Sequence, residues 1–432
     1  MPFMKVLWLA NVALPEASRL MGDAVLPFGG WVVGAAQMLA SLEDVQLSVA
    51  FLRKRITDVQ VLHGERITHY AVPYVRERTA SRLRGQCFRP TLSKVLALAV
   101  PDIVVVFGTE RAHSLAMIQE CEAHGIPCAI SLQGLLCVIW KHFMANLPFR
   151  VQYGCTLSEL LLYPGNLRAS RKTYLHRGRI EIEALQNVRH LIGRTTWDRV
   201  CAQQFNPNAR YYHCNEILRE EFYKHTWDIK RCERHSILVS QGDHPIKGLH
   251  IVLEALPLIL QRFPEVKVYV AGPNVAATPT LLSRLLQGSY GRYLRKLIWK
   301  YRLEAHIVFT GMLDERQMCE RFLRTHAFVS ASTIENESNS LSEAKLLGVP
   351  CVASYAGGVI DRVEHGKDGF FYAWDAPYML AHYACEIFAN DDLARTVSEN
   401  ARQSARRVND PERNLRTLLG IYASIISGKE VP

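Results

Sequence analysis

Residues 327–353 read AFVSASTIENESNSLSEAKLLGVPCVA, and the fold prediction starts from the pattern of this stretch. A short apolar run, Ala327–Ser330, is followed by a polar loop, a helix-like run at 342–347 and a second apolar run at 349–353. Continuous apolar runs of this length are typical of strands buried on both faces of a parallel sheet. The order strand, helix, strand therefore predicts a parallel βαβ unit.

The same alternation extends outward from this stretch over most of the chain. Strands are predicted at 5–10, 47–51, 102–107, 127–132, 188–193, 236–240, 266–271 and 306–310, and helices at 30–42, 112–124 and 248–262. Two such series predict an α/β protein with two doubly wound, Rossmann-like domains.

A charged and aromatic stretch, residues 215–234, separates the two series and holds no apolar strand. We therefore predict a first domain at residues 1–218 and a second at residues 219–410. Helix-like segments at 377–390, 393–408 and 411–427 close the chain. One interpretation packs the last of them, within residues 411–432, back onto the first domain.

The composition excludes a disordered chain. Of 432 residues, 49% are hydrophobic and 21% are charged, which are the proportions of a globular protein. Lys and Arg number 51 against 41 Asp and Glu, a net charge of +10, and this surplus favours an anionic partner.

Eleven cysteines are scattered without a CxxC pair, which favours free thiols in a reducing cytosol. The longest apolar stretch, 95–107, is interrupted by Pro101 and Asp102, so we expect no membrane-spanning helix. Peripheral contact with a membrane stays open.

Ligands of open α/β sheets bind beyond the carboxyl ends of the strands. Two loops there carry glycines before a predicted helix: Gly29–Gly30, and the stretch from Gly242 to Lys247–Gly248. A helix N-terminus attracts anions, and Lys247 adds a positive charge for phosphate. The alternatives are an ordinary Gly-Gly turn and a solvated lysine beside a capping glycine.

Glu335 and Glu343 give the strongest functional signal, with seven residues between them. A carboxylate one turn into the helix can accept two hydrogen bonds from a ribose diol, and the helix N-terminus can bind a diphosphate. The earlier carboxylate is then free to face a sugar. The alternative is helix capping, with Ser or Asn at the cap and acidic residues in the first turn.

The motifs together resemble a known family. Glu335-x7-Glu343 is followed by Gly348-Val349-Pro350, Ala353-Ser354 and Gly357-Gly358, and this series resembles the nucleotide-sugar motif of retaining glycosyltransferases of family 4, which have the GT-B fold. The resemblance also covers Gly29–Gly30, Lys247–Gly248 and Phe309-Thr310-Gly311, in the expected order. It implies two Rossmann-like domains that face a central cleft, with the acceptor on the N-terminal side.

The resemblance also implies roles for single residues. Glu343 would bind the ribose hydroxyls, and Glu335 would contact the donor sugar. Lys247 would neutralise the diphosphate. The other positions would be Asn339, Ser340 and Leu341 as backbone donors to the diphosphate, Gly311 and Met312 under the nucleobase, Gly29 and Gly30 near the phosphates, and His113 near the transferred sugar. A helical histidine such as His113 is also compatible with a purely structural role.

Two departures from the family pattern concern the donor. The family has Gly-Arg shortly before the lysine, whereas this chain has Ser240-Gln241-Gly242-Asp243, so Arg194 or another base would supply the second charge. The first glutamate is usually followed by Gly-Phe-Gly. Here Asn336-Glu337-Ser338 follows it, which predicts a more polar sugar pocket.

These expectations amount to a retaining, metal-independent hexosyltransferase without a cofactor. It would move a sugar from a nucleoside-diphosphate sugar to a hydroxyl of a glycan or lipid-linked acceptor, in polysaccharide or glycolipid biosynthesis. We expect a cytoplasmic protein, with contact to the anionic inner membrane face left open. The alternatives are a nucleotide-sugar epimerase or hydrolase of the same fold, and a basic nucleic-acid-binding protein; no helix-turn-helix, zinc or RNP signature supports the latter.

Overall fold

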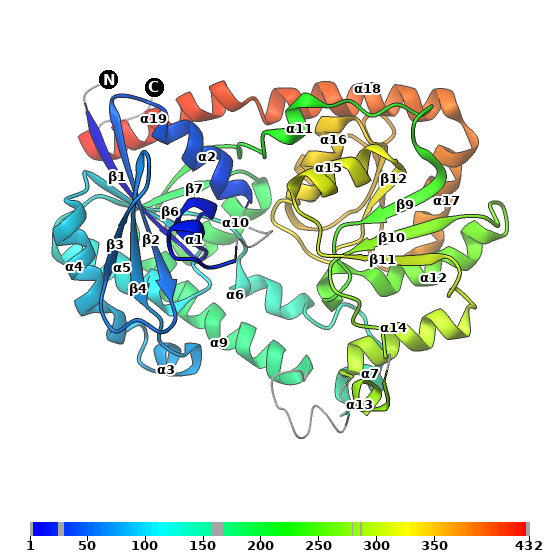
Figure 1. Ribbon diagram of the computed structural model, residues 1–432, viewed down its shortest axis with the longest axis horizontal. Coiled ribbons are helices and arrows are strands. Elements are labelled where there is room, and N and C mark those ends of the chain that lie inside the picture. Colours follow the sequence, from blue (N-terminus) through cyan, green and yellow to red (C-terminus); the bar gives the residue numbers. More distant parts are fainter. Residues whose placement is uncertain are drawn as a thin grey trace. The chain divides into compact units, whose positions relative to one another are not determined.

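The computed structural model describes residues 3–24, 30–154, 156, 167–278, 280–285 and 287–428. The chain forms two compact units, and each is built around its own sheet (Figure 1). Unit 1 comprises residues 1–138, 174–219 and 409–432, and unit 2 comprises residues 139–173 and 220–408. The prediction of an α/β fold with two doubly wound sheets is confirmed.

Unit 1 holds a sheet in the order β3-β4-β2-β1-β5-β6-β7-β8, parallel except where β3 pairs with β4. Its elements are β1 (Met4–Ala10), α1 (Pro15–Leu20), α2 (Gly30–Ala40), β2 (Val45–Arg53), β3 (Gln60–His63), β4 (Ile67–Pro73), α3 (Glu77–Arg82), η1 (Gln86–Phe88), α4 (Arg89–Ala99), β5 (Ile103–Phe107), α5 (Ala112–Ala123), β6 (Cys128–Ser131), α6 (Leu136–Ile139), α9 (Leu167–Gln186, in unit 1 from residue 174), β7 (His190–Gly193), α10 (Thr196–Phe205), β8 (Arg210–His213) and α19 (Pro411–Ser427).

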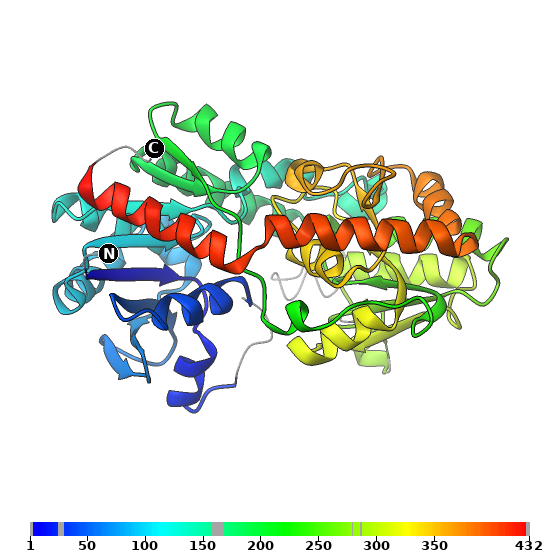
Figure 2. The same ribbon diagram turned by 90° about the horizontal axis from the view of Figure 1, so that it is seen from above.

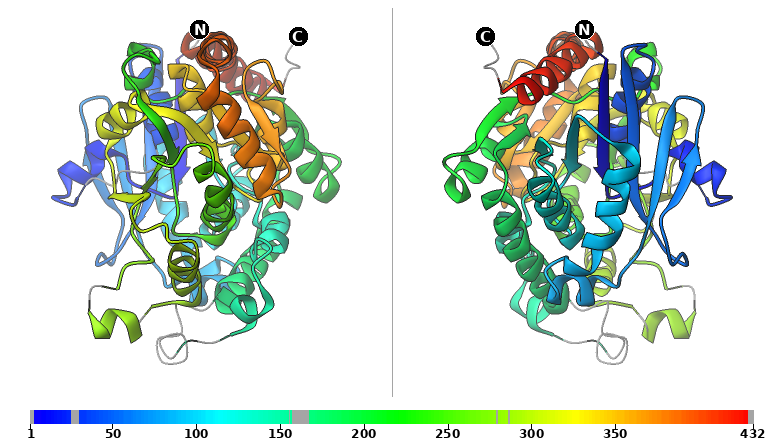
Figure 3. Two further views of the ribbon diagram at one scale, coloured as in Figure 1. Left: turned by 90° about the vertical axis from the view of Figure 1, so that its right-hand side faces the viewer. Right: turned by 90° about the vertical axis from the view of Figure 1, so that its left-hand side faces the viewer.

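Helices cover both faces of this sheet, as the right-hand view of Figure 3 shows. On one face α4, α5 and α9 contribute Leu92, Leu115 and Ile180 to a buried core. On the other, α2 and α19 pack over β1 and β5 (Figure 2). There the Trp8 indole N–H donates to the Tyr422 hydroxyl at 3.2 Å, inside the core. The last helix is thus an integral layer of unit 1.

Unit 2 holds a parallel sheet in the order β11-β10-β9-β12-β13-β14. Its elements are η2 (Trp140–His142), α7 (Phe149–Tyr153), α11 (Glu221–Lys224), β9 (Glu233–Val239), η3 (Pro245–Lys247), α12 (Leu249–Leu260), β10 (Lys267–Ala271), α13 (Leu281–Leu285), α14 (Ser289–Lys300), β11 (Ile307–Gly311), α15 (Glu315–Leu323), β12 (Thr325–Ser330), α16 (Asn339–Leu347), β13 (Cys351–Ser354), η4 (Gly357–Asp361), β14 (Phe370–Tyr372), α17 (Pro377–Ala389) and α18 (Asp391–Val408).

Residues 139–173 group with unit 2, whereas the sequence places them within a first domain of residues 1–218. Two contacts explain the grouping. Helix α7 packs against α14, and the buried His250 ring of α12 hydrogen-bonds the Ala145 carbonyl at 2.9 Å. Burial lowers the pKa of His250 to about 4, so the ring is neutral and donates this bond without the cost of burying a charge.

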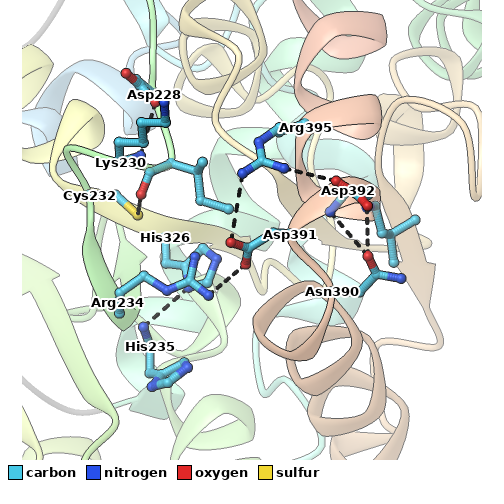
Figure 4. A network of polar contacts seen from close by, with 12 residues as sticks. Asp228, Lys230, Cys232, Arg234, His235, His326, Asn390, Asp391, Asp392 and Arg395 are labelled. Atoms are coloured by element: carbon cyan, nitrogen blue, oxygen red, sulfur yellow. Dashed lines mark hydrogen bonds and ion pairs between the residues drawn. The ribbon is translucent and has the colours of Figure 1, made fainter.

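A polar network holds the first turn of α18 against the amino ends of β9 and β12 (Figure 4). Arg234 of β9 pairs with Asp391 at 2.6 Å, and Asp391 in turn lies 3.8 Å from Arg395. Acidic residues in a first helical turn also complement the helix dipole. Since ligands of such sheets bind at the carboxyl ends of the strands, we assign this network to stability.

Over the described ranges, no helix is both long enough and apolar enough to cross a bilayer. The cysteines in this part of the chain are free thiols, in agreement with the interpretation of their spacing.

Candidate functional site

Two neighbouring strands of unit 2 direct the candidate residues to one edge of its sheet. β9 ends at Val239, and the loop after it leads through η3 to Lys247. β12 pairs with β9 and ends at Ser330, and the loop after it carries Glu335. The Thr333 N–H donates to the Ile246 carbonyl at 2.7 Å, so the two loops are joined through their backbones.

Lys247 and Glu335 lie side by side at this edge. The Lys247 Nζ donates to Glu335 Oε2 at 2.6 Å, and the Ser332 hydroxyl donates to the same oxygen at 3.2 Å. Both charged side chains stay partly exposed, at 31% and 18%. The sequence thus identified two residues, 88 positions apart, that the fold brings into contact. Ser332 was not among its candidates.

Two glycines allow the backbones around this pair to approach closely. Gly248 has φ +72°, and a Cβ there would lie 1.9 Å from the Ala331 carbonyl oxygen. Gly357 has φ +56°, and a Cβ there would lie 2.0 Å from the Glu335 carbonyl oxygen, which accepts from the Gly358 N–H at 2.9 Å. Only glycine satisfies both conditions, so these positions fix the backbone on either side of the ion pair.

Helix α16 begins next to Glu335. Ser338 is its N-cap and accepts from the Leu341 N–H, which also bonds the Ser338 carbonyl. The predicted capping is therefore present, but the Leu341 N–H is already used. Asn339 and Ser340 head the helix, where N–H groups have no acceptor within the helix and attract anions.

Glu343 is the fifth residue of α16 and is 4% exposed. It lies beyond the first turn, which contains no acidic residue, so the interpretation of Glu343 as a first-turn capping acid is wrong. A buried carboxylate at this depth needs partners of its own.

The expected polar sugar pocket at Asn336-Glu337-Ser338 needs a correction. The Glu337 carboxylate accepts from Arg362 Nε at 2.6 Å, and neither side chain is more than 8% exposed. Asn336 is buried as well, at 2%. The Glu337 carboxylate therefore does not face a sugar pocket. It forms an internal ion pair with Arg362, the residue after η4, and this pair holds the loop in place.

A second buried pair supports α16. Lys345 Nζ lies 2.8 Å from Asp368 Oδ2 and also donates to the Arg362 carbonyl. Burial lowers the pKa of Lys345, and the Asp368 carboxylate opposes that shift. Nothing in the sequence pattern indicated these pairs, since each joins residues more than 20 positions apart.

The remaining positions of unit 2 lie at the same edge of the sheet. Gly242 follows β9 and packs against the side chains of Leu249 and Val270. Gly311 ends β11, and its carbonyl accepts from the Gly272 N–H at 2.8 Å. Met312 comes next and is 56% exposed, so it offers an open apolar side chain.

Three predicted positions belong to unit 1. Gly29 lies outside the described residues, and Gly30 begins α2. His113 lies on α5 and is 1% exposed, with its ring edge-on to Phe88. Burial, and then the charges of Arg111 and Arg177, lower the pKa of His113 to about 3, so the ring is neutral near pH 7.

Arg194, suggested as a substitute for the missing arginine, also lies in unit 1. Its guanidinium pairs with Glu216 at 2.7 Å, and both side chains are buried. Its charge is thus already balanced within unit 1, which weakens its candidacy for the diphosphate.

Among the described residues, no group of three or more His, Cys, Asp or Glu side chains is arranged to hold a metal ion.

The part of the chain that carries most of these residues is similar to known proteins. Residues 228–404 match the family model of glycosyl transferases group 1. The putative glycosyltransferase YtcC of Bacillus subtilis is 25% identical over 43% of this chain and 44% of that protein. The phosphatidyl-myo-inositol mannosyltransferase of Mycobacterium tuberculosis is 26% identical over 40% of this chain and 42% of that protein. The chain thus matches less than half the length of these curated relatives.

Solved structures share the fold over nearly the whole chain. Sucrose-phosphate synthase from Thermosynechococcus elongatus superposes with a TM-score of 0.73 at 14% identity, and the alignment covers 98% of this chain and 99% of that one. Anabaena HepE, solved with UDP and glucose, superposes with a TM-score of 0.66 at 16% identity, and the alignment covers 98% of this chain and 100% of that one. Residues 228–404 are therefore similar to the glycosyl transferases of group 1, and the two Rossmann-like units share the GT-B fold of these solved structures.

Proposed function

We propose that this protein transfers a hexose from a nucleoside-diphosphate sugar to a hydroxyl group of a glycan or lipid-linked acceptor, with retention of the anomeric configuration. The observation that carries the proposal is the Lys247–Glu335 pair, which lies beside the N-terminus of α16 within the matched region. The solved complexes of HepE with UDP and with UDP-glucose support a nucleotide-sugar donor.

The mechanism follows from the charges at this edge. As the bond between sugar and diphosphate breaks, negative charge grows on the leaving phosphate. Lys247 and the first N–H groups of α16 would stabilise that charge more in the transition state than in the ground state, without a metal ion. Glu335 would then exchange part of its contact with Lys247 for hydroxyls of the sugar.

The donor's ribose would meet Glu343. Its carboxylate would accept two hydrogen bonds from the ribose diol, as the family resemblance implies. As the family resemblance implies, Gly29 and Gly30 would approach the phosphates, and His113 would lie near the transferred sugar. Because the His113 ring is neutral, it would act through hydrogen bonds and not as a proton donor near pH 7.

Thermal unfolding in the presence of UDP, GDP, ADP and their sugars tests this proposal first. A rise in melting temperature with one nucleotide family is expected, since a ligand that binds only the folded state stabilises it by mass action. Product analysis with and without acceptor then separates transfer from hydrolysis or epimerisation. Failure of every nucleotide to shift the melting temperature would overturn the proposal.

Glu343→Ala is expected to weaken nucleotide affinity by about ten- to a hundredfold, because hydrogen bonds to a charged group contribute ~1.5–3 kcal/mol. Isothermal calorimetry with the nucleoside diphosphate measures the change. Glu399→Ala, which removes an exposed carboxylate on α18, is the matched control and should bind normally. Unchanged affinity in a folded Glu343→Ala protein would contradict the ribose role.

A further inference from the structure

One surface of unit 2 combines unbalanced positive charge with exposed apolar side chains. It is formed by α7, the first residues of α9, α13 and α14, and we call it the basic apolar surface. The exposed cations on these elements are Arg150, Arg168, Lys172, Arg292, Lys296 and Lys300. From Ala271 to Leu303 the sequence contains no Asp or Glu, and between residues 139 and 173 it contains only Glu159.

Helix α14 provides the centre of this surface. Tyr290, Leu294 and Leu297 are buried and fix one face of the helix against unit 2. The opposite stripe carries Arg292, Lys296, Trp299 and Lys300, which follow one another at intervals of helical turns. Trp299 is 75% exposed, an unusual position for the largest aromatic side chain unless it has a partner.

Helix α7 continues the surface, because it packs against α14 (Figure 1). Phe149 is 74% exposed, and its ring lies 4.6 Å from that of Tyr153. The Arg168 guanidinium lies over the Tyr153 ring and donates to the Tyr153 carbonyl at 2.6 Å. On α13, which directly precedes α14 in the chain, Leu282 and Leu285 are exposed as well.

Several arginines elsewhere on the protein are balanced by carboxylates. Arg53 pairs with Asp23, Arg84 with Glu183, and Arg89 with Glu120. In the described part of the chain no carboxylate forms an ion pair with Arg292 or Lys296. Their charge is thus available to an outside partner.

We propose that the basic apolar surface docks the protein onto an anionic membrane. Lysines and arginines would approach the lipid headgroups, while Trp299, Phe149 and the two leucines of α13 insert at the boundary with the acyl chains. A nucleic acid or an acidic glycan would satisfy the charges and could stack on Trp299 and Phe149, but it would leave the exposed aliphatic side chains Leu282 and Leu285 without a role. The combination therefore favours lipid, and it does not depend on the proposed enzymatic function.

Flotation with vesicles tests the docking, with no nucleotide sugar in the assay. The protein should float with vesicles of phosphatidylcholine and phosphatidylglycerol, fail to float with pure phosphatidylcholine, and detach at high salt. R292E/K296E should lower partitioning at least about tenfold, since each basic residue near an anionic surface adds measurably to binding. K230E/R316E reverses two exposed cations elsewhere on unit 2 and should bind as the wild type does.

The apolar contribution needs its own pair of variants. Trp299→Ser should lower partitioning by about tenfold, whereas Tyr378→Ser, at a 64% exposed aromatic on α17, should leave it unchanged. Equal flotation of the wild type and R292E/K296E would overturn the proposal. Loss of flotation in both control variants, K230E/R316E and Tyr378→Ser, would overturn it as well. Oligonucleotide or heparin binding that depends on Arg292 and Lys296 but not on Trp299, without vesicle binding, would overturn it too.

Failure of this proposal and failure of the proposed function are distinguishable. If R292E/K296E and Trp299→Ser keep the nucleotide-induced rise in melting temperature but lose vesicle binding, membrane docking is supported on its own. If the protein floats with anionic vesicles but no nucleotide raises its melting temperature, the proposed function is contradicted and membrane docking is not.

Discussion

Lys247→Ala is expected to lower kcat for sugar transfer by about a hundred- to a thousandfold, with a smaller change in the KM for the donor. The lysine would act on charge that develops only as the diphosphate leaves, and the loss of one such preorganised donor costs about that much in other enzymes. Steady-state kinetics with the nucleotide sugar found by thermal unfolding gives both constants.

The fold should survive this substitution, because Lys247 is a third exposed and its partner Glu335 keeps a hydrogen bond from Ser332. Circular dichroism and the melting temperature check this point. Lys230→Ala, which removes an exposed lysine outside the site, is the matched control and should leave kcat unchanged. If Lys247→Ala turns over within about twofold of the wild type, the assignment of this residue to the leaving group is wrong.

Arg362→Ala is expected to lower the free energy of unfolding by about 3–5 kcal/mol. The substitution leaves the Glu337 carboxylate, whose side chain is fully buried, without its cation. Urea unfolding followed by fluorescence measures the loss. Activity should fall as well, because Glu337 lies two residues from Glu335 and holds the same loop.

An exposed pair provides the control for this result. Lys367 and Glu364 lie 2.9 Å apart, but both side chains are at least 60% exposed. Lys367→Ala should therefore cost no more than about 0.5 kcal/mol. The double variant E337Q/R362M removes both charges and should recover part of the lost stability. Equal stability of Arg362→Ala and the wild type would show that the buried pair contributes nothing.

Strands with an apolar run could be predicted from the sequence in both sheets, including the edge strand β11, whereas strands without such a run could not. β5 is a continuous apolar run, β1 is interrupted only by Lys5, and β9 ends in the apolar residues 237–239. β8 reads Arg-Tyr-Tyr-His, and β14 has three residues, so neither shows such a run. β4 holds His69 inside the sheet, where Glu16 of α1 pairs with the ring at 2.8 Å. Only tertiary structure supplies that partner.

Part of the candidate site could likewise be predicted from the sequence, and part could not. Residue types at loop positions after the strands pointed to Lys247, Glu335 and the start of α16, because the direction of parallel strands fixes which edge a loop occupies. Ion pairs between residues that lie far apart in the sequence could not be predicted from it. Glu337 was therefore interpreted as part of a polar pocket, although Arg362, 25 residues later, binds it inside the protein.

Helix α19 has a consequence for the order in which the protein takes shape during synthesis. Its residues, 411–427, complete the core that also contains Trp8 of the first strand, yet the ribosome makes them after all of unit 2. Domains usually form in the order of translation. Here one apolar face of unit 1 stays uncovered until unit 2 has been synthesised and α19 has followed it. Unit 1 therefore completes its core after unit 2, although its first residues are made first.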